Sequence, residues 1–72
     1  MGDRRETPLE MARRHVREGE ARLAQQEAIV GDLERNHHDN QAALGRKSLD
    51  AIRTSLEAMK RHLRDIEARS ER

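Results

Sequence analysis

The histidine and carboxylate residues of this chain are the ones that could bind a metal ion or transfer a proton. His15 and His62 each have a carboxylate three residues further on, Glu18 and Asp65, and residues three apart share one side of a helix. Two histidines and two carboxylates resemble the inward-facing di-metal sites of helical bundles, although those sites place Glu before His. These four residues are candidate metal ligands, with histidines packed at a bundle interface or left in solvent as the alternative.

His37 and His38 form a second histidine pair, within the polar stretch 36–40. An exposed pair of this kind could chelate a metal or respond to pH. The flanking residues are Asn and Asp, however, which tolerate left-handed and turn conformations. We interpret this stretch as a turn.

No arrangement typical of an enzyme occurs in the chain. It has no glycine-rich phosphate loop, no nucleophile motif and no paired carboxylates that would mark a cleft. Ser48 and Ser55 lack an obvious base, and a rod two helices wide offers little concave surface for a substrate. The sequence predicts a protein that is not an enzyme and that carries no cofactor.

Two tracks of apolar or small residues predict the elements that position these side chains. The first track is Leu9, Ala12, Val16, Gly19, Leu23, Gln26, Val30 and Leu33, and the second is Ala42, Gly45, Leu49, Ile52, Leu56, Met59, Leu63 and Ile66. Alternating spacings of three and four are the heptad pattern of two helices that share a narrow seam. We expect an all-α antiparallel hairpin with helices over about 8–35 and 41–70 and a turn over 36–40, because a short connection joins antiparallel neighbours.

The first helix has a clear predicted start. Thr7 can act as the N-cap, Pro8 suits the first helical position, and Glu10 completes a capping box. Asp39 or Asn40 can cap the second helix. The whole chain, 1–72, forms one domain in this interpretation, and residues 1–6 are expected to fray.

The two tracks also predict how the helices align. If Leu9 lies level with Ile66, a small residue faces a large one in four layers: Ala12 with Leu63, Gly19 with Leu56, Val30 with Gly45, and Leu33 with Ala42. Such volume compensation keeps the separation of two packed helices even. The tracks therefore predict a specific register as well as a fold.

Charged residues beside the seam fit this register in part. Glu20 is expected opposite Arg53 and Glu27 opposite Arg46, whereas Arg13 opposite Lys60 would place two positive charges together. Exposed ion pairs contribute only about 0.2–1 kcal/mol each, so they select an alignment more than they stabilise it.

Self-association is the expected source of additional stability. A chain of 72 residues buries little apolar surface, and with no Cys it has no disulfide. One side of the hairpin is less charged than the other and carries His15, Arg22, Ile29, Ser48, Ser55 and His62. We predict that a second hairpin docks there to form a dimeric four-helix bundle, with Gln26 on the seam as a residue that specifies register or oligomeric state.

The composition favours a protein-binding role and leaves two alternatives. The chain has 15 basic and 14 acidic residues, interspersed along it, and no aromatic residue, whereas nucleic-acid binding typically requires a clustered basic surface. We predict an interaction or scaffold module with an unknown protein partner; a nucleic-acid-binding regulator and a His-based metal-binding bundle are the alternatives. No segment is long and apolar enough to predict a membrane span, and a cytoplasmic location is expected by default.

Several residues support a family resemblance. The pattern comprises His15, Val16, Glu20, Gln25, Gln26, Ile29, Val30, Leu33 and Glu34, then His38-Asp39, then Leu56, Met59 and His62. It resembles a set of short uncharacterised bacterial helical proteins, in which Gly commonly stands where this chain has His37. The resemblance implies a helical hairpin and no activity. In architecture the chain is also similar to the small plasmid-copy-number RNA-binding hairpin dimer, a likeness of fold that does not transfer function.

Overall fold

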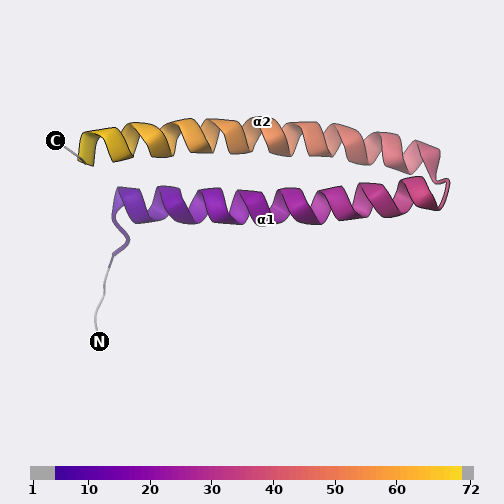
Figure 1. Cartoon of the computed structure of the whole chain (residues 1–72), viewed down its shortest axis with the longest axis horizontal. Helices are drawn as coiled ribbons and strands as arrows, with labels where there is room; N and C mark the ends of the chain where they lie inside the picture. The colour runs from indigo at the N-terminus through magenta and orange to yellow at the C-terminus, as the bar shows by residue number, and fades with distance from the viewer. Residues whose placement is uncertain (1–4, 71–72) are drawn as a thin grey trace.

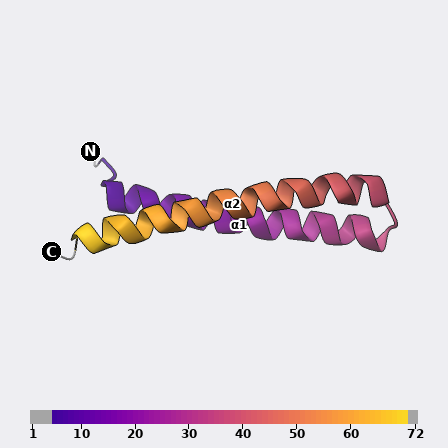
Figure 2. The ribbon, with the colours of Figure 1, turned by 90° about the horizontal axis from the view of Figure 1, so that it is seen from above.

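The computed structural model describes residues 5–70, which form two helices and no strand. Helix α1 spans Pro8–Arg35 and helix α2 spans Asp39–Ser70. The helices lie side by side and run in opposite directions (Figure 1), and their ribbons cross when seen from above (Figure 2). Such a crossing lets the side chains of two heptad patterns interdigitate. The predicted all-α antiparallel hairpin is confirmed.

The predicted capping box starts α1. The backbone N–H of Glu10 donates to Thr7 Oγ1 at 3.0 Å, and the backbone N–H of Thr7 donates to Glu10 Oε1 at 3.0 Å. Pro8 occupies the first helical position, where the lack of an N–H has no cost. Local residue types alone therefore determined where this helix begins.

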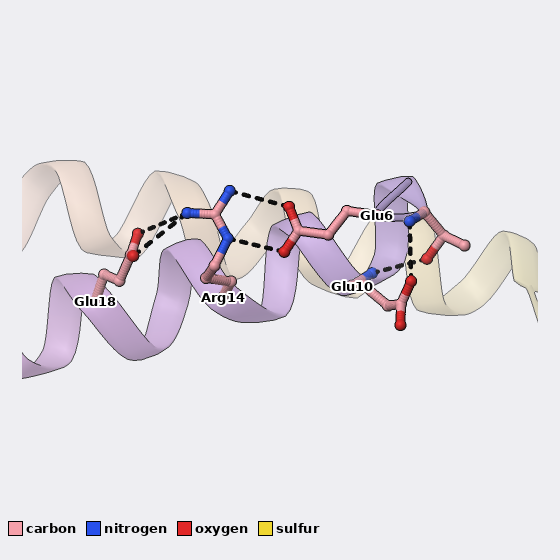
Figure 3. A network of polar contacts seen from close by, with 5 residues as sticks. Glu6, Glu10, Arg14 and Glu18 are labelled. Atoms are coloured by element: carbon pink, nitrogen blue, oxygen red, sulfur yellow. Dashed lines mark hydrogen bonds and ion pairs between the residues drawn. The ribbon is translucent and has the colours of Figure 1, made fainter. Parts of the chain in front are cut away.

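Arg14 holds the chain that precedes α1 against the helix (Figure 3). Its Nε and Nη2 atoms donate to the two carboxylate oxygens of Glu6 at 2.8 and 3.0 Å, and its Nη1 donates to Glu18 Oε1 at 3.2 Å. These hydrogen bonds lower the pKa of the Glu6 carboxyl below its ordinary value and raise the pKa of Arg14. Of the segment predicted to fray, residues 1–4 lie outside the described part, whereas Glu6 is anchored.

The turn is shorter than predicted, because α2 begins at Asp39 rather than at about residue 41. His37 has a φ of 60°; its N–H donates to the Glu34 carbonyl at 3.2 Å, and the N–H of His38 donates to the Leu33 carbonyl at 2.9 Å. This is a Schellman motif with His37 in the left-handed position that glycine usually occupies. Three residues are enough to reverse the chain in this way.

The start of α2 also differs from the predicted cap. The Ala42 N–H donates to the His38 carbonyl at 2.8 Å, so His38 occupies the N-cap position. Asp39 instead lies in the first turn of the helix, where its negative charge is favoured by the helix dipole. Asn40 lies inside the helix.

The core is a single row of side chains along the seam. The buried residues all belong to the two predicted tracks: Ala12, Val16, Gly19, Val30, Ala42, Leu49 and Leu56. A Cβ built on Gly19 would lie 3.0 Å from Leu56 Cδ1, and one built on Gly45 would lie 2.8 Å from Val30 Cγ2. These contacts confirm two of the predicted small-against-large layers.

Candidate interaction surface

Four ion pairs join α1 to α2 along one face of the hairpin. They are Arg13 with Glu67 at 3.8 Å, Glu20 with Lys60 at 3.6 Å, Glu27 with Arg53 at 3.4 Å, and Glu34 with Arg46 at 2.7 Å. Successive pairs are one heptad apart on each helix, and their side chains are 41% to 55% exposed. We call this face, which also bears Asp50, the ion-pair face.

The partners on α2 lie one heptad beyond those expected from the sequence. Glu20 meets Lys60 rather than Arg53, and Glu27 meets Arg53 rather than Arg46. The Cα–Cβ bonds of a helix point toward its N-terminus, so side chains on two antiparallel helices lean in opposite directions. Two such side chains therefore touch only when the Cα atom of each residue lies further toward the C-terminus of its own helix than the point of contact. The unfavourable Arg13–Lys60 neighbour pair predicted from sequence is therefore replaced by two opposite-charge pairs.

The opposite face of the hairpin is much less charged, and we call it the open face. Its members follow the heptad pattern on the other side of the seam: Met11, His15, Glu18, Arg22, Gln25, Ile29 and Asp32 from α1, and Leu44, Ser48, Ala51, Ser55, Ala58, His62 and Asp65 from α2. The three large apolar residues that the described chain leaves exposed, Met11 at 41%, Ile29 at 44% and Leu44 at 65%, all belong to it.

A shallow hollow of about 170 Å³ lies on the open face near its middle. Residues from both helices line it: Gly19, Arg22, Ala51, Ile52, Ser55, Leu56 and Met59. A second hollow lined by His15, Glu18, Gly19, Arg22 and Met59 continues it along α1. The hollow exists because Gly19 has no side chain and because Ala51 and Ser55 have short ones.

The residues predicted to mediate self-association lie together on the open face, with one exception. Ile29, Arg22, Ser48 and Ser55 are exposed there. Gln26 lies on the seam and is partly buried, and its Nε2 donates to the Gly45 carbonyl oxygen at 3.2 Å. Whether these residues contact a second copy stays a prediction.

Sequence reasoning missed two of the three exposed large apolar residues of this face, Met11 and Leu44. Each lies four residues before a residue that the prediction included, His15 and Ser48 respectively. Residues four apart are neighbours on a helix surface, so extending the face by one turn would have found both. Arg22 makes no ion pair within the described chain, whereas Glu18 is paired with Arg14.

The candidate metal ligands His15, Glu18, His62 and Asp65 do not assemble into a metal site. Within residues 5–70, no three His or carboxylate side chains are grouped so that they could hold an ion. Glu18 instead accepts hydrogen bonds from Arg14 through both carboxylate oxygens, at 3.2 and 3.3 Å. His15 and His62 are both exposed.

The basic residues beside the seam are neutralised by neighbouring carboxylates. Arg13, Arg46, Arg53 and Lys60 each lie within 3.8 Å of a Glu oxygen on the other helix. A surface that binds nucleic acid by phosphate neutralisation needs unpaired basic side chains in a cluster. The ion-pair face therefore lends little support to a nucleic-acid-binding function.

The fold and its surfaces define a class of protein: a two-helix antiparallel hairpin with one face covered by ion pairs and one face open. Compared with protein-family models, curated proteins and solved structures, the chain matches none of them. The two resemblances noted from the sequence stay expectations. Neither helix, over the part of the chain that the structure describes, has an apolar stretch long enough to cross a bilayer.

Proposed function

We propose that this chain is a non-enzymatic, self-associating helical hairpin that acts as a small protein-interaction or scaffold module. The observation that carries the proposal is the contrast between its two faces. One face has four cross-helix ion pairs, whereas the other has every exposed large apolar side chain of residues 5–70. Because these apolar side chains all lie on the less charged face, that face is the one we expect another protein to cover. Bacterial origin and a cytoplasmic location stay predictions from the sequence.

The hairpin exposes more surface than a compact monomer of the same mass would. The accessible surface of the chain is 5916 Å², whereas a compact monomer of 8.4 kDa would expose about 4,600 Å². The excess is roughly 1,300 Å², and each partner in a standard protein interface buries about 800 Å². A second hairpin could cover such an area and would add a layer of buried side chains that the single seam lacks.

Light scattering coupled to size-exclusion chromatography tests the proposal directly. At micromolar concentration we expect a mass twice the 8.4 kDa of one chain. Ile29→Lys places a charge on the open face and should shift the protein toward monomer. Ala28→Lys is the matched control, because Ala28 is the adjacent exposed residue and lies outside both faces. A folded wild-type monomer across this concentration range would refute the proposal.

A further inference from the structure

We infer that two copies of this chain pair through their open faces about a twofold axis perpendicular to the helices. In this arrangement α1 packs antiparallel to α1 of the second copy, and α2 packs antiparallel to α2. The inference rests on the proposed self-association and specifies its symmetry. The order of side chains along the open face favours this symmetry.

The open face of α1 is complementary to itself when the axis lies level with residue 20. Met11 and Ile29 are then equally far from the axis and face each other across the two copies, and they are 41% and 44% exposed in the single chain. Glu18 faces Arg22 in the same way, and His15 faces Gln25. The pairing therefore joins apolar to apolar and acid to base, as a twofold interface between identical surfaces requires.

Neighbouring registers lack this complementarity. Shifting the axis by half a heptad in one direction would place Met11 against Arg22, and shifting it in the other would place Ile29 against Glu18. Either shift covers an apolar side chain with a charged one, which is costly at an interface. Of these three registers of α1, only the one centred on residue 20 joins apolar to apolar and acid to base.

A twofold axis parallel to the helices gives a different dimer, in which α1 covers α2 of the second copy. That arrangement brings Ile29 against Leu44, but it places Glu18 and Arg22 opposite Ser55 and Ala51. Arg22 makes no ion pair among the described residues, so it would meet no carboxylate there either. Charge complementarity favours the perpendicular axis.

The axis level on α2 follows from the seam. Gly19 packs against Leu56, so residue 20 of α1 lies level with about residue 55 of α2, and Ser55 falls next to the axis. The neighbouring residues on the open face of α2 are Ala51 and Ala58, and short side chains allow two helices to approach closely. The hollow beside Ser55 would lie at the centre of the dimer.

Single-cysteine crosslinking tests this symmetry, because the chain has no natural Cys. Ser55→Cys should form a disulfide-linked dimer under mild oxidation, since residues at a twofold axis can meet the distance limits of a disulfide. Thr54→Cys is the control, as the adjacent exposed residue that points away from the open face. We expect Ser55→Cys to crosslink at least roughly tenfold faster, because proximity raises the effective concentration of reacting groups.

Two outcomes separate failure of this inference from failure of the proposed function. If the chain is dimeric but Ser55→Cys crosslinks no faster than Thr54→Cys, while Ile29→Cys crosslinks with Leu44→Cys, the axis runs parallel to the helices and the inference is wrong. If the wild-type chain is a folded monomer, the proposed function fails as well.

Reversal of a single charge provides an independent check on the α1 pairing. Arg22→Glu would place two carboxylates opposite each other at two symmetry-related positions and should weaken dimerisation about tenfold, which corresponds to roughly 1.4 kcal/mol. Arg17→Glu makes the same change in charge at an exposed position of α1 outside the open face. Equal dissociation constants for the two variants would overturn the proposed facing of Glu18 and Arg22.

Discussion

Val30 packs so closely against Gly45 across the seam that a Cβ placed on Gly45 would lie 2.8 Å from Val30 Cγ2. From the neighbouring layer, Gln26 Nε2 donates to the carbonyl oxygen of the same glycine at 3.2 Å. A side chain at position 45 would push against both contacts. Gly45 therefore lets α1 and α2 approach closely in the half of the hairpin next to the turn.

Alanine substitution should have opposite effects at two helical glycines. Gly31→Ala should stabilise the fold by about 0.5–1 kcal/mol, because alanine is the better helix former and the nearest atom to a Cβ there is Arg35 Nη1 at 3.4 Å. Gly45→Ala should destabilise it by about 1 kcal/mol or more, because overpacking outweighs that gain. Urea unfolding measures both changes, and stabilisation by Gly45→Ala would contradict the tight packing.

Replacing the polar residue of the seam should raise stability. Gln26→Leu removes the hydrogen bond to the Gly45 carbonyl oxygen, but that oxygen still accepts its hydrogen bond within helix α2. The substitution also adds apolar surface at a partly buried position. We expect a gain of about 1 kcal/mol, seen as a rise of roughly 4–8 °C in Tm. Oligomeric state should become less uniform, as measured by light scattering. An unchanged Tm would argue against burial of this side chain.

Glycine should be better than histidine at the left-handed position of the turn. His37 has a φ of 60°, a conformation that costs an L-residue about 1–2 kcal/mol and glycine much less. His37→Gly should therefore stabilise the hairpin, by about 0.5–1 kcal/mol after the added flexibility of the unfolded chain is counted. His38→Gly is the control, because His38 lacks a positive φ. Equal effects of the two changes would argue against the Schellman motif.

The ion-pair register can be measured with a double-mutant cycle. Glu27→Gln and Arg53→Gln should show a coupling energy of about 0.2–1 kcal/mol, as exposed pairs do, because the two side chains meet at 3.4 Å. The same cycle with Arg46 in place of Arg53 should show almost no coupling, since Arg46 pairs with Glu34. A measurable coupling of Glu27 with Arg46, and none with Arg53, would instead support the ion pair expected from the sequence.

The carboxyl of Glu6 should titrate at lower pH than a free glutamate. Hydrogen bonds from Arg14 lower its pKa below the ordinary value, so this contact stabilises the folded chain above that value and is lost as pH falls through the folded pKa. Carbon NMR of the Glu6 carboxyl measures the shift, and Arg14→Gln should raise the pKa back toward the ordinary value. A Glu6 pKa that is the same in both proteins would show that the anchoring contact is absent in solution.

Local sequence signals accounted for most of the fold. The heptad tracks predicted both helices and paired Gly19 with Leu56 and Val30 with Gly45, because the spacing of apolar residues along the chain identifies the residues of the seam. The capping box at Thr7 determined the first boundary for the same reason. The predicted end of the turn was wrong by two residues, because it depends on the left-handed backbone conformation of His37. Glycine usually occupies such a position, so a histidine there gives no sequence signal for it.

Residue spacing and capping residues were enough to predict two amphipathic helices folded back along one apolar seam, since both signals lie within short stretches of the chain. Which charged side chains meet across that seam could not be read from the spacing and depends on the packed arrangement of the two helices. Glu27 reaches Arg53 and not Arg46, because side chains on antiparallel helices lean in opposite directions along the axis. The heptad positions of Met11, Ile29 and Leu44 place them on one face, and the structure shows that all three are exposed there.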